Sequence, residues 1–296
     1  MQPLKPNAQR RLLRNKKAVS PAISTIILTA VTVVLILVAM NYATNFMTKR
    51  MAENEFSANK QFMLTTGLQI DDMAWTIGRT QTSRYTTSYG NIQFQSNALE
   101  YTLEVKDDSG WQNVSSVKTG MIMFSIPVNM YSLNNGYFER LSSSNSSFLQ
   151  EGASASCASV YCIEKLPMSD GSFVRIVAVP TLRMLQSNIG STNYYKFYLP
   201  VLNNGQNLYL SQSVTMTGNN ITKVVNDGIS AVRLNVTFPN SGLGFNSDFF
   251  NFDSDDQIND GLLSKTIQLD KLDSKSDSTS VVEFYMGNVV VAVGKV

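Results

Sequence analysis

The side chains that carry out most protein chemistry are scarce in this sequence. Histidine is absent from all 296 residues, which excludes Ser-His-Asp and Cys-His catalysis and every histidine-ligated metal site. No glycine-rich phosphate loop of the G-x-x-x-x-G-K or G-x-G-x-x-G type occurs. The neighbouring acids Asp71/Asp72 and Asp255/Asp256 could form a carboxylate pair for acid–base catalysis, but we interpret them as solvated acids. We therefore expect a protein that is not an enzyme and uses no cofactor.

One acidic segment has the oxygen-rich composition of a calcium loop. It runs from Asp253 to Gly261 with the sequence DSDDQINDG. An EF-hand loop needs glycine at its sixth position, which here is Ile258. We interpret the segment as an exposed acidic loop and predict no metal centre, with calcium binding at 253–261 as the open alternative.

Cys157 and Cys162 are the only cysteines. They occur in or just after residues 142–159, a segment with eight serines that is typical of an exposed, mobile loop. In an oxidising exterior the pair is expected to form a local disulfide. A zinc site is not expected, because two thiolates need further ligands and the chain has no histidine.

Four Asn-x-Ser/Thr sequons provide candidate glycosylation sites. They lie at Asn113, Asn145, Asn220 and Asn235. Each sequon alone is a weak signal in a chain rich in asparagine and serine. Together they favour an exported glycoprotein.

The N-terminal region combines a basic segment with a long apolar run. No acid precedes Glu53, and 31 uncharged residues separate Lys17 from Lys49. A helix needs about 20 apolar residues to span the hydrocarbon core, whereas the apolar part of a removable secretory signal has about 7–15. The run therefore predicts a membrane helix, and we assign it to residues 19–47. A nucleic-acid-binding arm is not expected, because such arms do not continue into long apolar segments.

The junction between these two segments carries a recognisable motif. Lys16 and Lys17 are followed by Ala18 and then by VSPAI at residues 19–23. This order resembles the class III signal peptide of archaeal type IV pilins and archaellins. The resemblance implies that a prepilin peptidase cuts the Ala18–Val19 bond, removes the leader 1–18 and leaves the helix on the mature protein. An uncleaved signal anchor is the alternative.

The residues after the cut favour the archaeal form of the signal. Bacterial pilins usually carry Phe first and Glu fifth, where this chain has Val19 and Ile23. Pro21 suits the first turn of a helix, and Ser20 is a good N-cap. The positive-inside rule keeps the leader cytoplasmic and places the residues after Met47 outside. Removing the six basic leader residues changes the formal charge from +2 to −4, which makes nucleic acid an improbable partner.

One side of the apolar helix carries small residues at spacings of three or four. They are Ala22, Thr25, Thr29 and Thr32. Such a stripe lets helix backbones approach closely, and threonine hydroxyls can bond to their own helix. In the filaments that the resemblance implies, these helices bundle into the fibre core. Mere tolerance of Thr and Ala in a single-span anchor is the alternative.

The remaining chain predicts an α+β protein with a mainly antiparallel β head of sandwich or barrel-like form. Residues 48–84 are expected to form a helical stalk, in which Met63, Ile70, Met73 and Ile77 share a face. Residues 85–296 contain short runs rich in Val, Ile, Tyr and Phe, separated by turn signals such as Asn203-Asn204-Gly205.

We thus expect a single-pass membrane protein with a cytoplasmic N-terminus and an extracellular head. The resemblance implies a pilin-like subunit, minor or adhesive, of a type IV-like filament at the cell surface. Its partners would be the prepilin peptidase, other pilin-like subunits, the assembly platform and the membrane. A membrane-anchored extracellular receptor or solute-binding protein that uses the same signal is the alternative.

Overall fold

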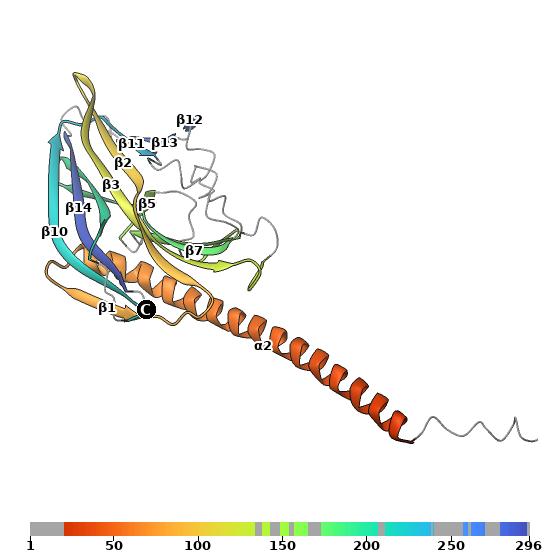
Figure 1. Cartoon of the computed structure of the whole chain (residues 1–296). Helices are drawn as coiled ribbons and strands as arrows, with labels where there is room; N and C mark the ends of the chain where they lie inside the picture. The colour runs from red at the N-terminus through yellow and green to blue at the C-terminus, as the bar shows by residue number, and fades with distance from the viewer. Residues whose placement is uncertain are drawn as a thin grey trace, which may run out of the picture. The chain divides into compact units, whose positions relative to one another are not determined.

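A computed structural model shows one long helix followed by a β-rich domain (Figure 1). The structure describes residues 21–133, 138–142, 149–153, 157–164, 173–206, 211–237, 239, 257–259, 262–269 and 279–294. The chain divides into two units, residues 1–51 and residues 52–296. The expected α+β class with a mainly antiparallel β head is confirmed.

Helix α2 (Pro21–Ala74) is continuous over 54 residues, a length of about 80 Å. The predicted stalk 48–84 is wrong at its far end, because the helix stops at Ala74 and Thr80–Arg84 forms strand β1. Gly78 has a positive φ of 77° and donates its N–H to the carbonyl of Gly218. This left-handed residue turns the chain from the helix into the sheet.

The described strands form two sheets (Figure 1). In order across the first, sheet A, they are β1 (Thr80–Arg84), β10 (Ser213–Asp227), β14 (Thr279–Gly294), β9 (Thr192–Asn204), β8 (Leu182–Ile189) and β5 (Leu149–Glu151). The second, sheet B, contains β12 (Gln257–Asn259), β13 (Leu262–Gln268), β11 (Ala231–Thr237), β2 (Asn91–Asp107), β3 (Gly110–Pro127), β7 (Phe173–Pro180), β6 (Ala158–Glu164) and β4 (Phe138–Arg140). Among the pairings described, β14 with β9 and β5 with β8 are parallel and the others are antiparallel.

Alternate side chains of the same strands enter two separate cores. In β3, Met121 and Met123 join a cluster between the sheets, while Ile122 and Phe124 join a cluster that contains helix residues. Strand β14 divides in the same way, with Phe284 in the first cluster and Val291 in the second. Since successive strand residues point to opposite faces, the curled sheets are covered by apolar packing on both sides.

The part of α2 from residue 52 to residue 74, which we call its head segment, buries one face. Its buried apolar residues are Ala52, Phe56, Met63, Ile70, Met73 and Ala74. Spacings of three and four put these side chains on one stripe. The prediction that Met63, Ile70 and Met73 share a face holds, but Ile77 lies beyond the helix and is exposed.

The end of the helix lies directly on sheet A. A Cβ atom at Gly218 of β10 would collide with the carbonyl oxygens of Met73 and Thr76, and one at Gly287 of β14 with the carbonyl of Ala74. Glycine is therefore required at both points of close approach. This contact fixes where the helix stops.

Candidate functional site

The motif expected to be cut lies just outside the described part of the chain. Lys16, Lys17, Ala18 and Val19 all precede Pro21, the first described residue, which is already helical. Proline fits the first turn of a helix because its missing N–H has no intrahelical partner there. The structure thus leaves the processing motif as a sequence prediction.

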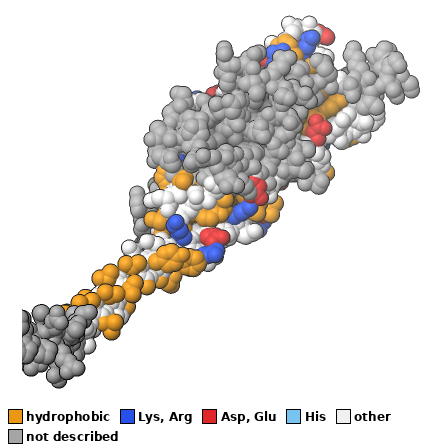
Figure 2. Space-filling view, turned by 90° about the vertical axis from the view of Figure 1, so that its right-hand side faces the viewer, with side chains coloured by type: hydrophobic (Ala, Val, Ile, Leu, Met, Phe, Trp, Pro, Cys, Tyr) orange, Lys and Arg blue, Asp and Glu red, His pale blue; other side chains and the backbone are white. Residues whose placement is uncertain are grey.

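The apolar segment of α2 exposes its side chains on all sides. Every described side chain from Ile23 to Met47 is exposed, including Leu28 at 69% and Tyr42 at 74%. Figure 2 shows the resulting band of apolar side chains on the visible face. In the described part of the chain, α2 is the one helix long and apolar enough to cross a membrane. A patch of this size needs a cover of lipid or protein, and the segment is compatible with a single-pass anchor.

The threonines of the small-residue stripe bond within their own helix. The Thr29 hydroxyl donates to the carbonyls of Thr25 and Ile26, both at 2.9 Å, and the Thr32 hydroxyl donates to Leu28 at 2.8 Å. The side chain of Ala22 lies outside the described set. With their hydroxyls satisfied, Thr29 and Thr32 present mainly methyl groups, so this side can face lipid or another helix without an unmet hydrogen bond.

A carboxylate on α2 ties the head segment of the helix to the loop before β2. Glu55 accepts backbone N–H groups from Ser88 (2.7 Å), Tyr89 (3.1 Å) and Gly90 (2.7 Å). Consecutive amides that converge on one anion form a nest, in which charge-assisted hydrogen bonds are strong. This site could not be predicted from the sequence, because its donors are main-chain N–H groups, which every residue except proline carries.

Asn59 adds a second tie one turn further along. Its Nδ2 group donates to the carbonyl of Glu55 at 2.9 Å and to that of Thr86 at 3.2 Å. Asn59 is 2% exposed, so the amide is held in a dry contact where unpaired donors would be unfavourable. Together these two side chains fix the helix against residues 86–90.

Charged and aromatic side chains form a column across sheet A. Tyr198 of β9 stacks on Tyr285 of β14, with Arg183 of β8 5.1 Å from the Tyr198 centroid and Lys223 of β10 5.2 Å from the Tyr285 centroid. We call Arg183, Tyr198, Tyr285 and Lys223 the aromatic column. Arg183 also lies 3.6 Å from Asp71 of α2. The column therefore links the end of the helix to four strands.

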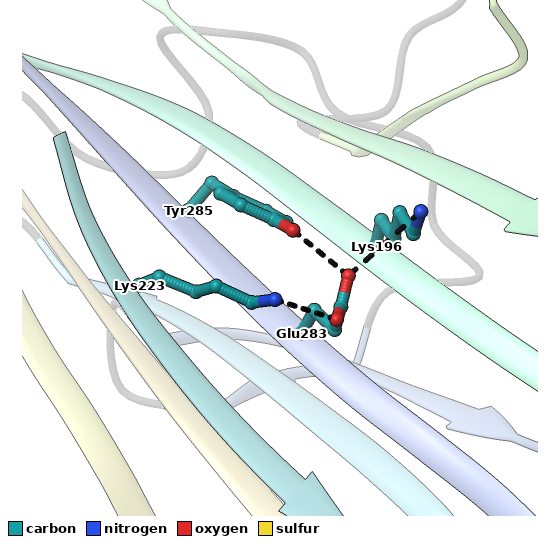
Figure 3. A network of polar contacts seen from close by, with 4 residues as sticks. All are labelled: Lys196, Lys223, Glu283 and Tyr285. Carbon is teal, nitrogen blue, oxygen red and sulfur yellow. Dashed lines mark hydrogen bonds and ion pairs between the residues drawn. The ribbon is translucent and has the colours of Figure 1, made fainter.

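Glu283 of β14 contacts two members of the column, Lys223 and Tyr285 (Figure 3). It accepts hydrogen bonds from Lys223 at 2.7 Å and from the Tyr285 hydroxyl at 2.8 Å, and Lys196 lies 3.9 Å away. Burial acts to raise the pKa of Glu283, but these hydrogen bonds and the two lysine charges outweigh it, so its pKa lies below the ordinary value. The cluster is suited to holding strands together rather than to proton transfer.

The predicted Cys157–Cys162 disulfide is not formed in the structure. Cys157 is a buried free thiol, and strand β6 extends from Ala158 to Glu164. Five residues of extended backbone separate the cysteines by about 16 Å, whereas disulfides need Cα atoms within about 7 Å. The interpretation of 142–159 as an exposed loop is also wrong in part, since Leu149, Gln150, Cys157 and Ala158 are buried.

The burial of Cys157 also determines its chemistry. Desolvation raises the pKa of this thiol far above its ordinary value, and the nearby charge of Asp71 raises it further. The reactive form of cysteine is the thiolate. We therefore expect an inert thiol.

The sequons occupy different environments. Asn113 and Asn220 are exposed on β3 and β10, and Asn220 lies at the irregularity in strand pairing between Gly218 and Ile221. The side-chain oxygen of Asn235 on β11 is buried and unbonded among the described residues. Asn145 lies outside the described set. Among the described sequons, Asn113 and Asn220 are the accessible candidates.

The acids singled out in the sequence do not form a catalytic or metal centre in the described residues. Asp71 accepts the indole N–H of Trp75 at 2.8 Å, while Asp72 pairs with Arg79 at 2.7 Å. The described residues contain no group of three or more potential metal ligands. Asp255, Asp256 and most of the acidic segment 253–261 lie outside the described set, which includes only its residues 257–259.

Function must therefore be inferred mainly from helix α2. The helix joins an exposed apolar segment to a head segment that is bonded to its loop and sheet. The expected processing motif, Lys16 to Val19, precedes Pro21 in the sequence. Comparison with protein-family models, with curated proteins and with solved structures found no match to this chain.

Proposed function

We propose that this chain is a pilin-like cell-surface subunit that is cut at Ala18–Val19 and assembles through helix α2 into a type IV-like filament. The observation that carries the proposal is the division of α2 into two parts. Residues 23–47 are uncharged, predominantly apolar and exposed on all sides, whereas residues 52–74 bury a single stripe in the head. One helix can thus serve first as an anchor and later as part of a fibre core.

The length of the uncharged run supports assembly over permanent anchoring. Residues 21–40 alone extend about 30 Å as a helix, which matches the hydrocarbon core. The uncharged helix continues to Thr48, and Met40, Tyr42, Phe46 and Met47 are all more than half exposed. A helix bundle would cover this additional apolar surface, which a bilayer of that thickness leaves in the interface.

The partners in this proposal are those that the resemblance of the N-terminal motif implies. The prepilin peptidase, other pilin-like subunits and an assembly platform are the partners, and the membrane holds the chain before assembly. The basic leader keeps the N-terminus cytoplasmic, so the head is extracellular. A head of this size suits a minor or adhesive subunit.

N-terminal sequencing and electron microscopy of native material test the proposal. Protein recovered from sheared surface filaments should begin at Val19, and antibodies against the head should label those filaments. An intact Met1 in the assembled form would contradict the processing step. A protein that stays in the membrane fraction and never labels a filament would support a membrane-anchored receptor instead.

A further inference from the structure

Three exposed polar residues form a row on the apolar part of α2. Asn41, Asn45 and Lys49 follow one another at intervals of four and are all exposed. The Asn45 Nδ2 group donates to Asn41 Oδ1 at 3.1 Å. We call these three residues the donor row, because two amides and an ammonium group carry more N–H donors than this single bond uses.

The donor row lies beyond the segment that a bilayer needs. If residues 21–40 fill the hydrocarbon core, whose thickness of about 30 Å they match, Asn41 begins the part of the helix outside it. Water and headgroups can satisfy the row while the chain is in the membrane. Once neighbouring subunits cover the helix, the same donors need acceptors on protein, because unpaired buried donors are unfavourable.

Asn59, in the head segment of α2, shows one contact that an asparagine of this helix makes. Asn59 belongs to the same helix α2 as the donor row and lies in its head segment, residues 52–74. Asn59 uses its amide to bond the main-chain carbonyl of Thr86 in the head. An asparagine of α2 thus donates to a main-chain carbonyl of the head within its own chain.

The distribution of charge along the chain also favours the head of another copy as the partner of the donor row. Eight of the 24 basic residues precede residue 52 and all 22 acidic residues follow it, so residues 52–296 carry a formal charge of −6. Lys49 adds a positive charge to the donor row, and complementary charge favours docking on an acidic surface. A contact between two different surfaces that repeats without closing builds a filament.

We propose, on the basis of the function proposed above, that the donor row of one subunit binds the acidic head of a neighbouring copy of the same chain. The amides of Asn41 and Asn45 donate to main-chain carbonyls of that head, and Lys49 pairs with its carboxylates. The contact fixes the position of one subunit along the next. The apolar side chains of α2 supply most of the affinity between subunits, and the donor row sets their relative position along the filament.

A charge reversal with a matched control tests this contact. Lys49→Glu puts a negative charge in the donor row, whereas Arg50→Glu makes the same change one residue further along, where the guanidinium of Arg50 lies over Phe46 at 5.4 Å. The fraction of processed chain recovered in filaments should fall at least about tenfold for Lys49→Glu and stay within about twofold of wild type for Arg50→Glu. Equal recovery of both variants, whether high or low, would overturn the proposal.

A second pair of variants keeps the test decisive if charge reversal prevents membrane insertion. Asn41→Leu with Asn45→Leu removes the amides, while Thr44→Val with Thr48→Val removes hydroxyls that bond carbonyls of their own helix at 2.8 and 2.9 Å. Filaments of the leucine variant should lose the single helical rise and twist of wild type, and those of the valine variant should keep them. If filaments of the Asn41→Leu, Asn45→Leu variant kept the helical rise and twist of wild type, the proposed contact would be overturned. Absence of wild-type chain from any filament would instead refute the proposed function.

Discussion

The phenol rings of Tyr198 and Tyr285 are stacked 4.9 Å apart with an angle of 7° between their planes. The two residues are direct partners in the parallel pairing of β9 with β14. A stack between adjacent strands contributes more than burial of the same area. Here Arg183 and Lys223 extend it on both sides, so the stack links β8, β9, β14 and β10.

The Glu283 carboxylate, which contacts this column, should give the head an acid-sensitive contribution to stability. Because the pKa of Glu283 is lowered in the folded protein, its contribution is present above the ordinary glutamate pKa of about 4.3. That contribution is lost as the pH falls from there through the lowered folded value. Glu283→Gln should reduce the free energy of unfolding at neutral pH by roughly 1 kcal/mol. The variant should also lose less stability than wild type as the pH falls. Thermal melting of the detergent-solubilised chain from pH 7 to pH 3 measures both effects.

Glu151→Gln is the control for the acid-sensitive contribution, because Glu151 is exposed on β5. Its melting curve should follow wild type at each pH. A Glu283→Gln chain with the same pH dependence as wild type would show that the cluster does not contribute in this way.

The nest around Glu55 should be sensitive to removal of a single charge. Glu55→Gln places an amide where three main-chain N–H groups converge, so at least one donor loses its acceptor. We expect destabilisation of about 1–3 kcal/mol, with faster amide hydrogen exchange at Ser88, Tyr89 and Gly90. Hydrogen exchange followed by mass spectrometry measures this, and exchange at residues 88–90 that matches wild type would contradict it.

The basic pair before the expected cut should direct processing. Lys17→Glu removes a positive charge next to Ala18, and we expect the precursor to accumulate uncut in the membrane. Lys5→Glu makes the same change far from the cut and should be processed normally. Immunoblotting separates precursor from mature chain. Normal cleavage of Lys17→Glu would show that the peptidase does not read this charge.

Larger side chains on the small-residue stripe should leave membrane insertion intact but reduce incorporation into filaments. Thr29→Leu with Thr32→Leu adds bulk on the stripe, while Val31→Leu with Val38→Leu adds it on the opposite side of the helix. We expect both variants to be inserted and cut, and only the threonine variant to be depleted from filaments, because overfilled contacts force helices apart. Equal incorporation of the two would leave only the anchor role.

The buried thiol should be inert in the folded protein. Cys157 should resist alkylation at neutral pH and react once the chain is denatured, because burial keeps it protonated. Peptide mapping without reductant should show no bond between Cys157 and Cys162. Detection of that bond in exported protein would mean that residues 157–164 adopt another conformation after oxidation.

Patterns with a regular period could be predicted from the sequence, and contacts between distant segments could not. The run FVRIVAVP is one of the Val-, Ile- and Phe-rich runs expected to form strands, and it coincides with β7. The buried stripe through Met63, Ile70 and Met73 follows helical spacing. The end of α2 was missed because it depends on the approach of Gly218 and Gly287, more than 140 residues away in the chain.

Local composition gave a wrong prediction in one segment. The serines of 142–159 indicated a loop, yet Cys157 and Ala158 are buried where β6 begins. Serine is common in turns but is also tolerated in strands, so local composition did not reveal pairing with β7. The aromatic column was missed for a related reason, because its members come from four strands that only the sheet order brings together.

The position of β14 determines the order in which the head can fold. It is the last described strand in the chain, yet it lies between β10 and β9 in sheet A. Before β14 has been synthesised, sheet A consists of two separate fragments with unpaired edges, β1–β10 and β9–β8–β5. No other described strand connects them. Sheet A therefore closes only when nearly the whole head has been synthesised, long after helix α2 at the start of the described chain.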